Sequence, residues 1–150
     1  MEIQLTQGRT ALIDDEDYER VSKHGWVIRK DGYAHAYINK KSVLLHRFIA
    51  DPGEGVMIDH INMDRLDNRK VNLRPCTQSQ NRANVWLSIR NKTGYKGVDW
   101  NIRVKKYHAQ IKVDGKKIHL GYFDDKIEAA KAYDKAALIY FGEFSRINGV

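Results

Sequence analysis

The sequence predicts an α+β protein built from two small parts. Short strand-like runs separated by turn residues fill residues 3–38, and further short runs with one helix start follow them. Beyond a polar, charged stretch at residues 88–94, the pattern changes to three strand-like runs and one long helical segment. A chain of 150 residues is long enough for two such units, so we place their boundary in that stretch.

The composition favours a polyanionic partner. Lysine and arginine number 26 against 19 aspartates and glutamates, a formal charge of +7, which points to nucleic acid rather than to acidic small substrates. The one cysteine, Cys76, excludes an intramolecular disulfide and a Cys-x-x-Cys zinc site, and it is typical of the reducing cytoplasm, where we expect the protein. No run approaches the roughly 18 apolar residues of a membrane span, so no membrane partner is expected.

The first part is expected to contain short strands followed by a helix. Residues 32–39 alternate apolar and polar side chains, as in a half-buried strand. Residues 43–50 form a second strand or a short helix, which the turn residues Asp51-Pro52-Gly53 end. Further along, Thr77 and Gln80 have the spacing of a capping box that starts a helix.

One apolar run in this part contains polar residues that need an explanation. Residues 56–61 read as a short strand, yet Asp59 and His60 interrupt it, and a plain buried strand would not contain them. A loop rich in asparagine and aspartate follows at residues 62–68. Polar side chains in this arrangement indicate a site rather than a simple core.

The second part is expected to be a three-stranded antiparallel sheet with one helix. The strand-like runs lie at residues 95–102, 107–113 and 117–123, and Asp114-Gly115 joins the last two as a hairpin turn. The helix starts with Asp125 as its N-cap and ends near Gly142. Its aromatic residues are expected in the core: Tyr133, Tyr140 and Phe141.

The spacing around Asp59-His60 is the most specific signal in the chain. Asn72 follows His60 by 12 residues within Asn72-Leu73-Arg74, and Asn81 follows it by 21 residues in the expected helix. This register resembles the HNH nuclease family, in the phage-type homing endonuclease branch that has asparagine as the last motif residue. The resemblance covers residues 46–84 and implies a ββα-metal (His-Me finger) nuclease core that cuts DNA.

The resemblance assigns Asp59 and Asn81 as ligands of one divalent cation. Carboxylate and amide oxygens suit a hard cation that keeps several waters, so Mg²⁺ or Mn²⁺ is expected. The cation would contact the scissile phosphate and the departing 3′ oxygen, where negative charge develops. Cleavage would leave 5′-phosphate and 3′-hydroxyl ends.

The remaining motif residues take roles around the phosphate. His60 follows the aspartate on a strand, points to the opposite face, and is expected to deprotonate an attacking water in its neutral form. By resemblance, Asn72 is the central asparagine that steadies the loop between the hairpin strands. His46 has two alternatives, a phosphate contact near the metal or packing at the end of a strand.

Each of these residues has an ordinary structural interpretation as well. Asp59 alone could be a turn or capping residue, His60 a partly buried histidine, and the asparagines loop residues. Their joint register favours catalysis. A catalytically inactive, sequence-specific DNA-binding regulator is the alternative function, and an RNA-binding protein is a third that explains the charge but not the register.

The second part resembles an AP2 domain over residues 94–148. The motifs that carry the likeness are Gly94-Tyr-Lys-Gly-Val-Asp-Trp, residues 107–113, residues 118–124 and the alanine-rich helix. The resemblance implies that the sheet reads the DNA major groove. Strand alternation independently predicts that Lys112 and Lys117 point outward from the helix. A solvated charged face is the ordinary interpretation of such lysines. The expected DNA-binding residues are Lys96, Trp100, Arg103, Gln110, Lys112, Lys117 and His119.

Asp99 departs from the pattern, because plant AP2 domains commonly have a basic residue there, so we expect a different sequence preference. The expected organisation is a strand-rich supporting region at residues 1–42, the nuclease at residues 43–90 and the DNA-binding domain at residues 94–148. The expected partner is double-stranded DNA, bound by a monomer or a weak dimer, in a bacterial or phage-infected cell. One catalytic constellation per chain implies that each active site cuts one strand.

Overall fold

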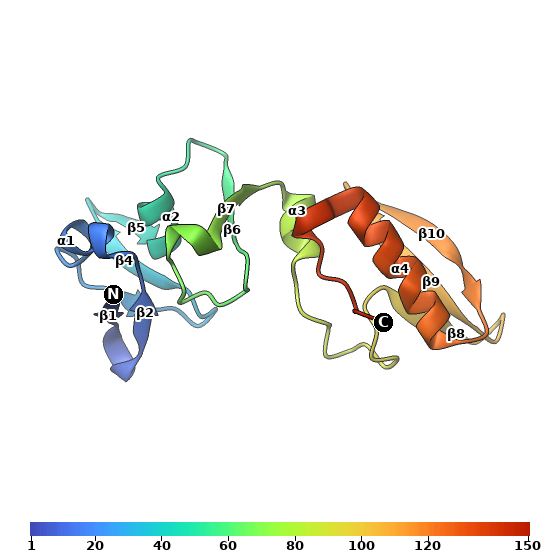
Figure 1. Cartoon of the computed structure of the whole chain (residues 1–150). Helices are drawn as coiled ribbons and strands as arrows, with labels where there is room; N and C mark the ends of the chain where they lie inside the picture. Colours follow the sequence, from blue (N-terminus) through green and yellow to red (C-terminus); the bar gives the residue numbers. More distant parts are fainter. The chain divides into compact units, whose positions relative to one another are not determined.

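The computed structural model describes residues 1–150, which divide into two compact units, Met1–Cys76 and Thr77–Val150 (Figure 1). Both combine short helices or one longer helix with small antiparallel sheets, as the α+β prediction requires. None of the helices has the length and apolar character that crossing a membrane demands.

The first unit contains three small sheets. β1 (Glu2–Gln4) pairs with β2 (Thr10–Leu12), a three-stranded sheet has the order β3 (Val27–Ile28), β4 (Ala34–Ile38), β5 (Lys41–Leu44), and β6 (Met57–His60) pairs with β7 (Leu73–Cys76). The helices are α1 (Tyr18–Val21) and α2 (Leu45–Ala50), with 3-10 turns η1 (Thr6–Gly8), η2 (Asp15–Asp17) and η3 (Lys70–Asn72). Residues 43–50 therefore end a strand and then form a helix, so both alternatives for this segment apply in turn.

A single apolar cluster holds this unit together. It joins strands near the chain start to α2, and Trp26 is fixed within it because its indole N–H donates to the Val21 carbonyl at 2.9 Å. The buried members are Ile3, Leu5, Ala11, Ile13, Val21, Trp26, Ala34, Ala36, Leu45 and Ile49. The N-terminal residues thus share one core with α2, the helix that contains His46.

The loop between β6 and β7 is held by β2. The Leu12 N–H donates to the Leu66 carbonyl at 2.7 Å, and the Asn68 N–H donates to the Leu12 carbonyl at 2.8 Å. Beyond it, the backbone N–H of Lys70 donates to the Asp14 carboxylate at 2.7 Å, and the Lys70 ammonium pairs with Glu16. A loop rich in asparagine and aspartate is therefore given a defined shape by a segment more than fifty positions earlier.

The second unit is a three-stranded antiparallel sheet covered by a helix. After α3 (Gln78–Ala83), the strands β8 (Val98–Asn101), β9 (Lys106–Val113) and β10 (Lys116–Phe123) follow in the order β10-β9-β8, and α4 (Lys126–Phe141) leads to η4 (Gly142–Phe144). Figure 1 shows α4 running along the sheet. The predicted capping box at Thr77 and Gln80 and the Asp125 N-cap are both confirmed. β8 is shorter than the strand predicted at residues 95–102.

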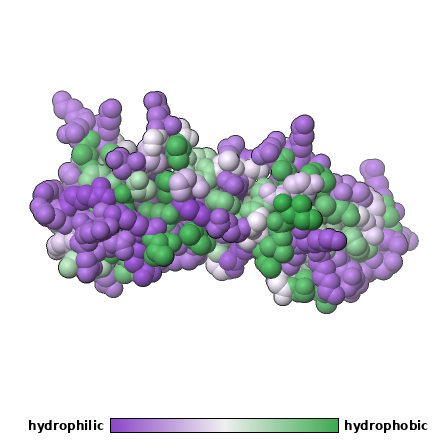
Figure 2. All heavy atoms as spheres, turned by 45° about the horizontal axis from the view of Figure 1, so that its top comes forward, coloured by the Kyte–Doolittle hydropathy of each residue, from purple (hydrophilic) through white to green (hydrophobic).

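The helix face that packs on the sheet differs from the prediction at one aromatic residue. Tyr133 and Phe141 are buried as expected, whereas Tyr140 is 47% exposed, so its predicted place in the core was wrong. Closely packed alanines build the rest of the contact, because they let helix and strands approach: Ala129, Ala130, Ala136 and Ala137. Figure 2 shows apolar patches on a surface that is otherwise mainly hydrophilic.

Gly97 lies where the backbone passes directly against Tyr133. Its φ is +75°, and a Cβ built there would lie 1.9 Å from Cδ2 of the tyrosine ring and 2.7 Å from the Gln110 carbonyl oxygen. Only a residue without a side chain fits this position. β8 begins at Val98, directly after this glycine, whereas the sequence predicted a strand from Tyr95.

Candidate active site

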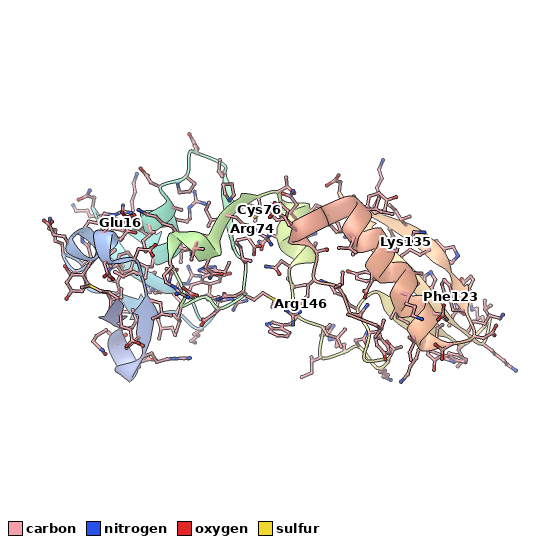
Figure 3. All side chains as sticks on the ribbon, viewed as in Figure 1. Glu16, Arg74, Cys76, Phe123, Lys135 and Arg146 are labelled. Carbon is pink, nitrogen blue, oxygen red and sulfur yellow. The ribbon has the colours of Figure 1, made fainter.

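The hairpin β6-β7 places Asp59 and His60 side by side at the end of a strand. Asp59 is 5% exposed and lies across from Arg74, while His60 is 4% exposed and lies across from Leu73. The Arg74 guanidinium, labelled in Figure 3, donates from Nη2 to Asp59 Oδ2 at 3.0 Å and from Nε at 3.2 Å. A buried carboxylate needs such charge-assisted partners, and Arg74 provides them for Asp59.

His60 lies in a pocket of aromatic and amide side chains. Its Nε2 is 3.2 Å from Oδ1 of Asn68, and its ring centroid is 5.0 Å from that of His46 and 5.9 Å from that of Tyr33. Burial lowers the pKa of His60 below its usual value, and the Asn68 hydrogen bond and the Asp59 charge partly offset this. The ring is therefore neutral at pH 7, which is the form that can accept a proton.

His46 packs against this imidazole from α2. It is buried, it lies in the first turn of the helix rather than at a strand end, and Tyr33 covers it at a centroid distance of 5.3 Å. Burial, together with the nearby His60 and Arg47, lowers the pKa of His46 to about 4. Arg65 stacks over the outer face of Tyr33, 4.8 Å from the ring centroid, and donates to the Asp31 carbonyl.

The depressed pKa of His46 predicts a stability loss in mild acid. The unfolded imidazole takes up a proton near pH 6.5, whereas the folded one stays neutral down to about pH 4. The unfolded state therefore binds more protons between these values, and the free energy of unfolding should fall by up to about 1.4 kcal/mol per pH unit as the pH is lowered through the window.

Urea unfolding followed by Trp26 fluorescence, in a background with Trp86 and Trp100 replaced by phenylalanine, measures this slope. His46→Gln should give a shallower slope than the parent, because glutamine does not titrate. Equal slopes for the two proteins between pH 6.5 and pH 4 would show that His46 is not the source of the acid sensitivity.

Asn72 braces the loop that follows His60. Its Oδ1 accepts from the Asn62 backbone N–H at 2.9 Å, and its Nδ2 donates to Asn62 Oδ1 at 2.9 Å and to the Asp67 carbonyl at 2.7 Å. Asp67 is bound in turn by Arg69 at 2.7 Å, and this hydrogen bond lowers the pKa of Asp67. The side chain of Asn72 thus satisfies backbone groups on both sides of the loop and does not touch the imidazole in these contacts.

Asn81, the other residue of the motif, lies in the middle of α3. The capping box of Thr77 and Gln80 fixes where this short helix starts. Within residues 1–150 no three or more His, Cys, Asp or Glu side chains gather into a group suited to a metal ion. Asp59 offers a buried carboxylate, and one carboxylate together with an amide oxygen and waters is a donor set that suits Mg²⁺ or Mn²⁺.

The outer face of the second unit's sheet carries polar residues from all three strands. Ala109, Ile111 and Val113 pack toward α4, which confirms the predicted alternation and leaves the residues between them on the other face. There His108 Nε2 lies 2.8 Å from His119 Nδ1, and Asp99 Oδ2 lies 3.2 Å from His108 Nδ1. Further exposed or half-buried side chains of this unit are Trp100, Arg103, Gln110, Lys112 and Lys117.

Lys96 is held inside the unit instead. Its ammonium donates to the Ala83 carbonyl and, at 3.1 Å, to the Val85 carbonyl. Burial, with a smaller effect of Arg146, lowers the pKa of Lys96 to about 8. The Lys96 ammonium is therefore bound by backbone carbonyls of its own unit.

Three residues of the site region had no assigned role from the sequence alone: Tyr33, Asn68 and Arg74. Asn68 is one of several similar residues in its loop, and Tyr33 lies far from the motif along the chain. The sequence could have indicated Arg74, because it belongs to the Asn72-Leu73-Arg74 segment and pairs with Asp59 in the hairpin. Only the tertiary contacts separate these residues from their neighbours.

A neutral histidine beside a carboxylate on one hairpin is typical of hydrolases that activate water with a histidine base. Comparison with known proteins agrees with this class. A family model described as HNH endonuclease matches residues 51–83. The chain is also 30% identical over 151 residues to an uncharacterized HNH endonuclease of Acanthamoeba polyphaga mimivirus, covering 96% of this chain and 77% of that protein. The chain belongs to the HNH endonuclease family.

Proposed function

We propose that the protein is a metal-dependent DNA endonuclease in which His60 is the general base. The observation that carries this proposal is the buried, neutral imidazole next to the Asp59 carboxylate on one hairpin. Asp59 and, from the family register alone, Asn81 would hold one Mg²⁺ or Mn²⁺ ion. When bound, the cation supplies positive charge to the scissile phosphate and the departing oxygen.

His60 takes the proton of the water that attacks phosphorus. The new phosphorus–oxygen bond forms as the bond to the 3′ oxygen breaks, and the departing oxygen takes a proton from a second water, leaving a 5′-phosphate and a 3′-hydroxyl. Arg74 holds the Asp59 carboxylate in place with two hydrogen bonds, from Nε and Nη2. One His60 per chain supports cleavage of one strand per active site, so a monomer on DNA would nick, and a double-strand break needs a weak dimer or two nicks. This activity fits a homing-type, site-specific enzyme.

Relaxation of supercoiled plasmid with Mg²⁺ or Mn²⁺ tests the proposal. We expect metal-dependent nicking that stops in EDTA and is lost in Asp59→Ala and His60→Ala at equal DNA occupancy. DNA binding without nicking, across many sequences and with both metals, would instead favour a DNA-binding regulator that retains a nuclease-like fold.

The second unit is proposed to hold the DNA in the manner of an AP2 domain. The outer sheet face supports this, because Lys112 and Lys117 are exposed there beside Gln110 and His119, and Trp100 and Arg103 lie at the end of β8. Lysines would bind phosphates, and Gln110 offers an amide for base edges. The Gln110 amide nitrogen also donates to the Asp99 carboxylate at 3.4 Å, so Asp99 should shift the sequence preference.

Removing one of these lysines should weaken DNA binding without changing its sequence preference. Lys117→Ala is expected to lower the slope of log K against log salt by about 0.9, because one phosphate contact is lost. Fluorescence anisotropy with duplex DNA across a salt series measures the slope. The matched control is Lys135→Ala, at an exposed position on α4 (Figure 3), which should leave the slope unchanged. Equal slopes for both variants would argue against the sheet face.

A further inference from the structure

Asn68 is the most deeply buried polar residue in contact with His60. Its exposure is 1%, and its Oδ1 lies 3.2 Å from His60 Nε2. The amide nitrogen of the same side chain donates to the Arg65 carbonyl at 3.4 Å, and the backbone N–H donates to Leu12 at 2.8 Å. Main chain and side chain of Asn68 are therefore both fixed.

These contacts set the direction of the hydrogen bond to the imidazole. The amide nitrogen of Asn68 faces the Arg65 carbonyl, which accepts only from a donor, so the amide oxygen faces His60. An amide oxygen only accepts, and Nε2 must therefore carry the proton. In a neutral ring with the proton on Nε2, the lone pair that can take up a further proton lies on Nδ1.

We propose that Asn68 is a positioning residue that holds His60 in the Nε2–H tautomer and so presents Nδ1 to the attacking water. The inference rests on the proposed nuclease function and assigns a role to a residue that does not touch substrate. Asn72 cannot take this role, because its amide binds Asn62 and the Asp67 carbonyl.

The contact with β2 extends the role to the N-terminal region. Leu12 binds the loop twice, donating to Leu66 and accepting from Asn68, so the loop cannot move away from His60 without breaking both hydrogen bonds. Leu12 thus helps to fix the position of Asn68 relative to the imidazole. The supporting region at the chain start therefore acts on the base through one amide group.

The tautomer is measured directly by long-range ¹H–¹⁵N NMR of the imidazoles in the full chain at pH 8, with His60→Gln to assign the signals. The parent should show His60 as Nε2–H. Asn68→Leu, close in volume but without an acceptor, should give a mixture of tautomers, and Asn68→Asp should keep Nε2–H because it retains an oxygen acceptor. Arg69→Ala loosens the same loop without touching His60 and should leave the tautomer unchanged.

Plasmid nicking supplies the second readout. Asn68→Leu should lower kcat by about 10- to 100-fold with little change in KM for DNA, and Asn68→Asp should recover part of the loss. If Asn68→Leu does not fold, Asn68→Ser removes the reach of the acceptor with a smaller change.

An Nδ1–H tautomer in the parent would overturn the inference, and so would an unchanged tautomer and rate in Asn68→Leu. A purely structural role would lower stability in Asn68→Leu and Asn68→Asp alike while the tautomer stayed the same. The spectroscopic result does not need activity. A parent with the Asn68-dependent Nε2–H tautomer but no nicking would therefore refute the nuclease function alone.

Discussion

His60→Ala is expected to lower the rate constant of plasmid nicking by about 10²- to 10⁴-fold, the range that loss of a general base produces. No neighbouring group can replace His60 as the general base, because the adjacent His46 is similarly buried and has a pKa of about 4. Single-turnover nicking at saturating DNA, with Mg²⁺ present, measures the chemical step. The affinity for DNA should change little.

His35→Ala is the matched control for this variant. His35 is a partly buried histidine on β4 of the first unit, and its Nδ1 lies 3.2 Å from the Val27 carbonyl, outside the site. Its nicking rate should stay within a few-fold of the parent. A His60→Ala protein that still folds and nicks at the parent rate would refute the role of His60 as the base.

Gly97→Ala is expected to destabilise the second unit by about 2–5 kcal/mol. Overpacking a core costs about 1–3 kcal/mol, and a left-handed backbone costs an alanine about 1–2 kcal/mol more. The clash at 1.9 Å is with the ring of Tyr133, a core residue that is 5% exposed. Urea-dependent hydrogen exchange of the β9 and α4 amides measures the loss.

Gly94→Ala separates the two contributions. Gly94 has a φ of +82°, but no atom lies within 4 Å of the position that a Cβ would occupy, so alanine there meets only the backbone cost. Its loss should be about 1–2 kcal/mol, smaller than that of Gly97→Ala. Equal losses in the two variants would mean that Tyr133 yields to the added methyl group.

Local signals predicted local structure in this chain. The capping box at Thr77 and the N-cap at Asp125 each depend on residues three positions apart, and both are present. The prediction that Tyr140 is buried was wrong. Helical spacing identifies a broad face of the helix, while the width of the three-stranded sheet decides how much of that face is covered. The size of the Tyr140 side chain does not show whether the sheet covers it, because that depends on where the strands lie.

The sequence likewise indicated some residues of the site and not others. Asp59 and His60 stood out because polar residues in an apolar strand need a reason. Asn68 did not stand out, because Asn62 and Asn72 lie in the same region and have the same chemistry. Which amide meets the imidazole depends on the pairing of Leu12 with the loop, a contact between distant segments that no local pattern contains.

That long-range pairing also bears on how the protein acquires its structure. The contact of Lys70 with Asp14 closes a separation of 56 residues, and contacts of such range form slowly because the chain entropy must be lost first. We therefore expect the loop that carries Asn68 to be among the last parts of the first unit to order during folding. A nascent chain would contain His60 well before that histidine has the surroundings it needs, so the nuclease would remain inactive until its own beginning has folded back onto it.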